Sequence, residues 1–212
     1  MSFLKPHKFK YFDKNLTGKP FNLLDVGAGS NSPTKTKEFY PQCNYHGIDR
    51  GNYRNSDADF KAMTAYYEMD LTELKFDVIP NDHFDIIIMS HVIEHLHNGD
   101  KVIEGLLPKL KKGGYIYIEF PGEKSTRLPS MRDTLNFYDD STHVRLFSHK
   151  EVSGILSKNG FTILKAGTRR HWPVILLLPF AIVHQWMKYK YIPGGVFWDL
   201  LGFAEFVYAR KE

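Results

Sequence analysis

The sequence predicts an open α/β fold built on a mostly parallel sheet. Short apolar runs, which are typical of buried strands, alternate along the chain with segments whose apolar residues recur at helical spacing. Apolar residues make up 42% and charged residues 25% of the 212 residues, which is the balance of a globular protein with a substantial core. The length fits one domain, 1–212, because two domains would each have a thin core.

The first predicted strand leads directly into the first predicted helix. Residues 21–27 form a short apolar run that ends in glycine. Ser32 then stands where an N-cap belongs, Pro33 occupies the first helical position, and Pro41 stops the helix. A strand, a turn and a helix therefore follow one another.

The same alternation continues to the end of the chain. The segment 100–114 has apolar residues at helical spacing and ends on lysines and Gly113, with a kink expected at Pro108. We expect further strands at 44–49, 65–70, 84–90, 115–120, 161–167 and 204–210 and further helices at 100–114 and 150–160. In a sheet of this kind ligands bind at the carboxyl ends of the strands, so functional residues should be sought there.

Two segments lie outside this alternation. Residues 1–20 are basic and aromatic, form an N-terminal arm, and lack the apolar core and cleavage site of a signal peptide. The segment 171–201 is an apolar insertion between the sixth and seventh strands, and its apolar stretch is too short to span a bilayer. Its tryptophans and lysines leave three roles open: peripheral membrane contact through 172–190, a lid on the sheet, or half of a homodimer interface.

Charge and cysteine content indicate the partners and the compartment. The net charge of +4 favours anionic partners slightly, and because long lysine or arginine blocks are missing, DNA is not expected as a partner. Cys43 is the only cysteine, so no intramolecular disulfide can form and a reducing compartment is the natural setting. We therefore expect a cytoplasmic protein and leave membrane association open.

Acidic residues and glycines mark the ends of the first three strands. Asp25, Gly27 and Gly29 form the pattern D-x-G-x-G, which lets the backbone approach a ligand while the carboxylate binds an ammonium or hydroxyl group. Asp49 follows about 20 residues later, where a carboxylate can accept hydrogen bonds from ribose hydroxyls. Asp70 ends the third strand. This series suits an adenosine ligand, although an ordinary strand-to-helix turn and a helix-start role for Asp70 stay open.

The order of these motifs resembles that of the class I S-adenosylmethionine-dependent methyltransferases, particularly the small type 11 group. The resemblance covers 21–167 and rests on the segments LLDVGAGS, YHGIDR, MDLTE, FDIIIMSHVIEHL, LLPKLKKGGYIYIEFPG and LFSHKEVSGILSKNGF. It implies a Rossmann-like fold with a seven-stranded, mostly parallel sheet, an antiparallel last strand, and helices on both faces. One departure is Asn31, which replaces a frequent third glycine but tolerates left-handed backbone angles.

The resemblance implies S-adenosylmethionine as the cofactor. At Gly27 and Gly29 the backbone would run close to its methionine part, and Asp49 would hold its ribose. Asp70 and Leu71 would frame its adenine. The expected cofactor-binding residues are Asp25, Gly27, Gly29, Asp49, Arg50, Asp70, Leu71, Ser90 and His91.

Three histidines follow the fourth strand. If a helix begins near His91, then His91, Glu94 and His95 share one of its faces. In one interpretation His95 is a general base that Glu94 or His143 orients. The catalytic residues would then be His95, His143 and Glu94. In a second interpretation a divalent metal is bound by His91, Glu94, His95 and His143. The segment resembles the metal-dependent O-methyltransferases of ubiquinone synthesis and of small-RNA 3′ ends. In a third the segment is structural. A metal is not expected.

The segment 122–148 follows the fifth strand, where the methyl acceptor usually lies in this family. Tyr138 and Arg145 are the expected substrate-binding residues, because aromatic and cationic groups suit a hydroxylated or anionic acceptor. The resulting hypothesis is O-methylation of a hydroxyl on a small molecule, a sugar or a lipid-linked glycan. The alternatives are a metal-dependent RNA ribose 2′-O-methyltransferase and a non-catalytic nucleotide-binding scaffold.

Overall fold

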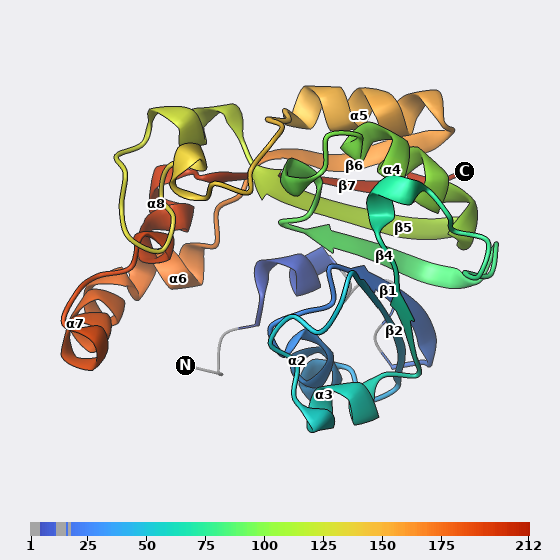
Figure 1. Cartoon of the computed structure of the whole chain (residues 1–212), viewed down its shortest axis with the longest axis horizontal. Helices are drawn as coiled ribbons and strands as arrows, with labels where there is room; N and C mark the ends of the chain where they lie inside the picture. Colours follow the sequence, from blue (N-terminus) through green and yellow to red (C-terminus); the bar gives the residue numbers. More distant parts are fainter. Residues whose placement is uncertain (1–4, 12–15, 17) are drawn as a thin grey trace.

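A computed structural model describes residues 5–11, 16 and 18–212, so part of the expected N-terminal arm lies outside the described residues. The strands are β1 (Phe21–Val26), β2 (Cys43–Asp49), β3 (Ala65–Glu68), β4 (Phe84–Ser90), β5 (Leu110–Pro121), β6 (Phe161–Thr168) and β7 (Ala204–Lys211). They form one sheet in the order β3-β2-β1-β4-β5-β7-β6 (Figure 1). Paired strands are parallel except that β7 runs antiparallel to both β5 and β6. The predicted fold is confirmed.

Helices flank the sheet on both faces. The α-helices are α2 (Ser32–Phe39), α3 (Asp57–Ala62), α4 (Gly99–Leu106), α5 (His149–Lys158), α6 (Trp172–Leu176), α7 (Leu178–Tyr189) and α8 (Trp198–Leu201). The 3-10 helices are η1 (His7–Tyr11), η2 (Leu71–Glu73), η3 (Ile93–His95), η4 (Leu107–Lys109), η5 (Glu123–Arg127), η6 (Phe137–Asp139) and η7 (Gly194–Phe197). α4 and α5 cover one face, and α2 and α3 lie on the opposite side (Figure 1).

Successive residues of β4 contribute to two separate cores. Ile87 belongs to a buried cluster that includes Val102 of α4. Its neighbour Ile86 belongs to a second cluster that includes Phe9 of η1 and Tyr40, which follows α2. Neighbouring side chains of a strand point to opposite faces, so a strand covered on both faces needs the continuous apolar run seen in the sequence.

Two elements differ from those expected. The helix expected over 100–114 ends before Pro108, which lies in η4, and β5 already begins at Leu110. The proline therefore marks a helix end rather than a kink, because it cannot supply the helical N–H and its ring crowds the preceding turn. The sequence pattern above did not predict α3. Its signal is a capping box, in which Ser56 and Asp59 each bond the other's backbone amide.

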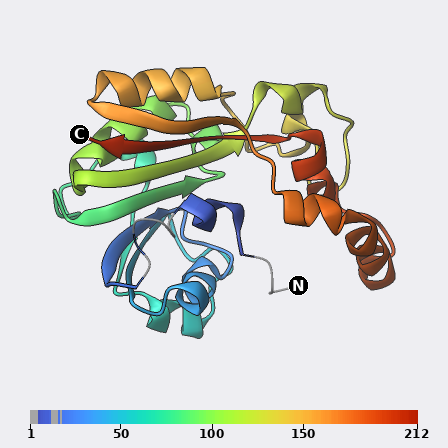
Figure 2. The ribbon, with the colours of Figure 1, turned by 180° about the vertical axis from the view of Figure 1, so that it is seen from behind.

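The insertion 171–201 forms α6, α7, η7 and α8. Figures 1 and 2 agree that α6 and α7 extend away from the sheet, at the end where the connection from β5 to α5 lies. The structure describes every residue of these two helices, and none of them is buried. Within residues 5–11, 16 and 18–212, no helix has the length and apolar character needed to cross a membrane.

Candidate active site

The glycine turn after β1 is closed against two other segments. The amides of Gly27 and the next residue donate to the carbonyl of Ile48 at 2.8 and 3.0 Å. Gly27 has a left-handed φ of 76°, and a Cβ there would lie 2.6 Å from Cγ2 of Val92. A Cβ on Gly29 would lie 2.8 Å from the carbonyl oxygen of Tyr53. Any larger residue would push these segments apart, so the turn requires both glycines.

The acidic ends of β2 and β3 adjoin this turn. The amide of Met69 donates to the carbonyl of Asp49 at 2.9 Å. Burial raises the pKa of the Asp49 carboxyl, although the backbone amide of Arg50 donates to it at 2.8 Å. Asp70 caps η2 by accepting hydrogen bonds from the hydroxyl and amide of Thr72, which lower its pKa. The carboxylates expected to hold ribose and adenine therefore lie at neighbouring strand ends.

Asp25 has a different environment from Asp49 and Asp70. Its carboxylate is 2% exposed and accepts hydrogen bonds from the hydroxyls of Ser32 and Tyr45, both at 2.5 Å. The Lys8 ammonium group lies 3.9 Å from the same oxygen. Burial raises the pKa of Tyr45, so its phenol stays a donor. Asp25 thus joins β1, β2 and η1 beneath the glycine turn.

Leu71 and the hydroxyl of Ser90, both expected at the cofactor, are shielded from solvent. Leu71 is 8% exposed and belongs to the core. The hydroxyl of Ser90 is buried and has no hydrogen-bond partner within the described part of the chain. Asn31, the substitute for a third glycine, has a left-handed φ of 61°. The backbone at Asn31 therefore has the conformation that a glycine would adopt easily.

His91 does not begin a helix. It has a left-handed φ of 55°, and only 93–95 form a short 3-10 helix. The prediction that His91, Glu94 and His95 share one face of a helix is therefore wrong. Instead, the His91 ring lies between two carboxylates, with Nδ1 3.2 Å from Glu94 Oε1 and Nε2 3.2 Å from Glu119 Oε1. Burial would lower the pKa of His91, but hydrogen bonds and charges of the two carboxylates raise it to about 9.

A buried charge network that the sequence analysis missed extends from Glu119. Nη1 of Arg169 lies 2.8 Å from Glu119, and its Nε and Nη2 lie 3.0 and 2.9 Å from the carboxylate oxygens of Asp199. The hydroxyl of Tyr117 donates to Glu119, and Nδ1 of His7 lies 3.0 Å from that hydroxyl. Burial would raise the pKa of Glu119, but Arg169 and the nearby imidazolium hold it well below its usual range. The network joins η1, β5, the residue that follows β6, and α8.

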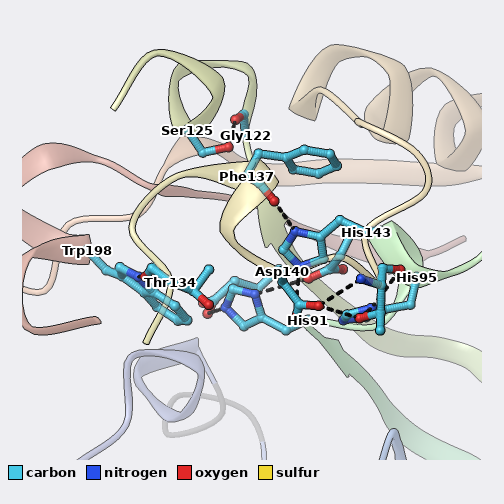
Figure 3. Close-up of polar contacts among 12 residues, drawn as sticks. His91, His95, Gly122, Ser125, Thr134, Phe137, Asp140, His143 and Trp198 are labelled. Carbon is cyan, nitrogen blue, oxygen red and sulfur yellow. Dashed lines mark hydrogen bonds and ion pairs between the residues drawn. The ribbon is translucent and has the colours of Figure 1, made fainter. Parts of the chain in front are cut away.

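The rings of His95 and His143 lie side by side, with their centroids 4.9 Å apart. Nδ1 of His95 lies 3.2 Å from the carbonyl oxygen of Thr142. Nδ1 of His143 lies 2.6 Å from the carbonyl oxygen of Phe137 (Figure 3). Nδ1 of His95 also lies 2.9 Å from the hydroxyl of Thr142, which itself donates to the Asp140 carboxylate at 2.5 Å. The oxygens at both Nδ1 atoms therefore accept, so in each neutral ring Nδ1 carries the proton and Nε2 keeps a lone pair.

Glu94 completes a cluster with these two histidines. Its side chain is 1% exposed, and Oε2 has no hydrogen-bond partner among the described residues. One carboxylate oxygen of Glu94 and one ring nitrogen each of His95 and His143 lie within 4.8 Å of one another. Two imidazoles and a carboxylate fit a transition ion such as zinc better than magnesium. His91 is not part of this cluster, and as an imidazolium it has no lone pair for a metal.

The two expected substrate residues have different environments. Tyr138 is 74% exposed on the connection between β5 and α5. Arg145 forms ion pairs with Asp100 of α4 and Glu151 of α5, both at 2.8 Å. A substrate anion at Arg145 would have to displace one of these carboxylates. The arrangement therefore favours a structural role for Arg145 and leaves Tyr138 available to a ligand.

Asp139 organises the same connection. Its carboxylate accepts hydrogen bonds from the amides of Met131, Leu135 and Asn136 at 2.8 to 3.0 Å and from the hydroxyl of Ser130. Burial would raise the pKa of Asp139, but these hydrogen bonds lower it to about 2. The side chain thus fixes the loop that carries Tyr138.

Trp198 of the insertion covers His91. The ring centroids of the two residues lie 4.9 Å apart, and the indole stacks on Phe203 at 4.5 Å. The indole N–H donates to the carbonyl of Thr134 at 2.6 Å (Figure 3). The insertion and the connection from β5 to α5 therefore meet above the strand ends, where the histidines lie.

Sequence comparison places the chain among known protein families. Residues 5–166 match a family described as a methyltransferase domain. The match covers β1 to β5 and residues 161–166 of β6, but not β7. It includes the candidate site residues named above except Arg169, Trp198, Asp199 and Phe203. No curated protein matches the sequence.

Solved structures with the same fold include several methyltransferases. A SAM-dependent methyltransferase from Archaeoglobus fulgidus is 19% identical with a TM-score of 0.60, over 96% of this chain and 91% of that one. Phosphoethanolamine N-methyltransferase 2 from Haemonchus contortus, in complex with S-adenosyl-L-methionine, is 15% identical with a TM-score of 0.66, over 95% of this chain and 51% of that one. The 1,6-didemethyltoxoflavin-N1-methyltransferase from Burkholderia thailandensis, with S-adenosylhomocysteine, is 15% identical with a TM-score of 0.56, over 92% and 72%. At these identities the likeness shows the fold.

Proposed function

Because this chain belongs to the methyltransferase-domain family and is therefore an enzyme, we propose that it transfers a methyl group from S-adenosylmethionine to a hydroxyl oxygen. The acceptor class that we propose is a small molecule, a sugar or a lipid-linked glycan. Two structures of similar fold contain S-adenosylmethionine or S-adenosylhomocysteine, which supports this choice of methyl donor. Their N-methyltransferase names leave the acceptor atom to be argued from this chain's own residues.

The strand ends supply groups that fit the methyl donor. Gly27 and Gly29 let the turn pack closely against Val92 and Tyr53, which fixes its backbone beside the strand ends. Asp49, directly beside that turn, would bind the ribose diol, and Asp70 follows the end of the adjoining strand β3. The unpartnered hydroxyl of Ser90 offers a further polar contact at the end of β4. These features support a cradle for the adenosyl group.

The observation that carries O-methylation is the shared tautomer of His95 and His143. Both Nδ1 atoms donate to backbone carbonyls, so both Nε2 atoms can accept a proton from an acceptor hydroxyl. Imidazole is the side chain that most often serves as a general base. The buried carboxylate of Glu94 beside the two rings would stabilise the imidazolium that forms.

The proposed reaction is an in-line displacement. S-adenosylmethionine supplies an electrophilic methyl carbon on a sulfonium. The acceptor oxygen forms the new bond to this carbon while the carbon–sulfur bond breaks and its electron pair stays on sulfur. The hydroxyl proton passes to Nε2 of His95 or His143. Reacting atoms must be held at about 3 Å, so the protein contributes by positioning the acceptor under Trp198 and beside the histidines.

A second candidate uses a divalent metal to lower the pKa of the acceptor hydroxyl, as in the RNA ribose methyltransferases considered above. The specific observation is the unpartnered, buried Oε2 of Glu94 near two imidazole nitrogens. Glu94, His95 and His143 would hold the ion, which would act as a Lewis acid. Zinc titration by calorimetry tests this directly: binding by wild-type protein that Glu94→Gln abolishes favours the metal, whereas no binding favours the histidine base.

The proposed base is tested by separating turnover from cofactor binding. We expect His95→Gln and His143→Gln to lower turnover of a hydroxylated acceptor by roughly 100-fold or more, with S-adenosylhomocysteine affinity by calorimetry unchanged. His97→Gln is the matched control, because His97 is exposed two residues away. Asp49→Ala should instead weaken S-adenosylhomocysteine binding. Wild-type protein that binds neither cofactor form would refute the proposed function, and unchanged turnover in both histidine variants would refute the base.

A further inference from the structure

The α6–α7 arm, residues 172–189, exposes its apolar side chains to solvent. Leu176, Phe180, Val183 and Met187 are 57 to 74% exposed, and they recur at spacings of four, three and four residues. Within α7 this spacing places Phe180, Val183 and Met187 along one side, and Leu176 adds an exposed apolar side chain at the end of α6. Folded chains usually turn such a stripe inward, so its exposure indicates an interaction surface.

Aromatic residues with a polar group frame this stripe. Trp172 at the start of the arm is 64% exposed, and Trp186 and Tyr189 near its end are 56% and 44% exposed. Tryptophan and tyrosine side chains combine an apolar ring with a hydrogen-bonding group, which favours the boundary between water and lipid. The arm is too short to span a bilayer, so these rings suit a helix that lies in the interface.

The charge of the arm and of the sequence around it has one sign. Residues 171–198 contain no acidic residue, whereas they contain Lys188 and Lys190. Lys188 and Lys190 are exposed at the end of α7. Asp199 itself is buried and paired with Arg169, so it does not offset the basic charge at the surface. An anionic surface complements this segment.

From this combination we infer that the α6–α7 arm docks on the surface of a membrane that contains anionic phospholipids. A second copy of the chain fits less well, because a two-fold interface pairs the same patch of both copies and the arm has no acidic residue to pair with Lys188 and Lys190 of the other copy. Lipid headgroups would neutralise these charges while the apolar stripe enters the acyl boundary. This inference does not depend on the methyl acceptor or on turnover.

Vesicle co-sedimentation of the full chain tests the inference. Vesicles of phosphatidylcholine with phosphatidylglycerol should pellet the protein, those of phosphatidylcholine alone should pellet much less, and added salt should release it. Lys188→Gln with Lys190→Gln should lower partitioning roughly 25-fold, at about fivefold for each lysine. Lys150→Gln with Lys158→Gln, which removes the same charge from exposed sites on α5, is the control and should have little effect.

An apolar pair of variants tests the stripe separately. Phe180→Ser should lower partitioning at least tenfold, because a phenyl ring would leave the lipid. Val78→Ser is the control, since Val78 is 68% exposed and Phe180 is 69% exposed. Both sites are exposed, so neither variant threatens folding, and circular dichroism checks this.

Three results would overturn the inference. The first is wild-type protein that does not bind anionic vesicles, and the second is arm variants that partition like wild type. The third is a homodimer, measured by analytical ultracentrifugation, that Phe180→Ser converts to monomer while wild-type protein does not bind vesicles. A blue shift of tryptophan fluorescence on vesicle addition, reduced in Trp186→Phe, supports the inference independently of sedimentation.

Discussion

Replacing Arg169 with methionine should destabilise the protein far more than the same replacement at Arg145. Arg169 makes three hydrogen bonds of 2.8 to 3.0 Å to Glu119 and Asp199, and the three side chains are only 7 to 15% exposed. Methionine fills similar volume but leaves two buried carboxylates without their main cationic partner. Breaking a buried pair in this way costs about 3 to 5 kcal/mol of the free energy of unfolding.

Arg145 is a matched control because its geometry is similar and its burial is not. It pairs with Asp100 and Glu151 at 2.8 Å each, but the three side chains are 30 to 38% exposed. Water screens such pairs, and each is worth about 1 kcal/mol or less. We therefore expect Arg145→Met to cost no more than about 2 kcal/mol. In a domain of this size each kcal/mol lowers Tm by about 2 to 4 °C, so the two variants should differ clearly.

Urea unfolding followed by circular dichroism measures both free energies, and equal m-values confirm that the comparison is valid. Arg169→Met combined with Asp199→Asn should be less destabilised than the sum of the single changes, because the second change removes a charge that the first leaves unpaired. If Arg169→Met lost no more stability than Arg145→Met, the buried network would not contribute as described.

The other predictions concern the glycine turn and the charged imidazole. Gly29→Ala should weaken S-adenosylhomocysteine binding measured by calorimetry, because its Cβ would lie 2.8 Å from the Tyr53 carbonyl, whereas Gly154→Ala, which meets open space, should bind as wild type; equal affinities would contradict this. The pKa of His91 is raised to about 9 from an unfolded value of about 6.5. The stability from its charge is therefore complete below pH 6.5 and lost as pH rises through 9. The free energy of unfolding should fall by about 1.4 kcal/mol per pH unit in that window. His91→Gln should reduce this slope. Wild-type protein without the slope would refute the ion pairs of His91.

The sheet was predictable because its signals are local. Buried strands such as 84–90 appear as continuous apolar runs, and β4 is indeed covered on both faces. Asp49 and Asp70 end strands that pair side by side, so the topology alone brings them together. The family resemblance, confirmed by the match over 5–166, rests on the same local motifs.

The details of the candidate site were less predictable because they depend on distant residues. Arg169 meets Glu119 and Asp199 across 50 and 30 positions of sequence, and each charge alone is typical of a surface residue. The expected helix at His91 failed for a related reason. The left-handed turn at His91 is held by its amide, which donates to the Glu119 carbonyl at 2.8 Å, and by ion pairs that no spacing rule indicates.

The buried network explains how the insertion is positioned over the strand ends. Ion pairs of this kind add little stability compared with apolar packing, so their effect here lies mainly in geometry. Asp199 holds α8 against Arg169, and α8 places Trp198 over His91 and against the Thr134 carbonyl. The α6–α7 arm leads into this same segment. An arm docked on a membrane would therefore hold the covered strand ends close to the lipid surface, and among the proposed acceptors a lipid-linked glycan fits this arrangement best.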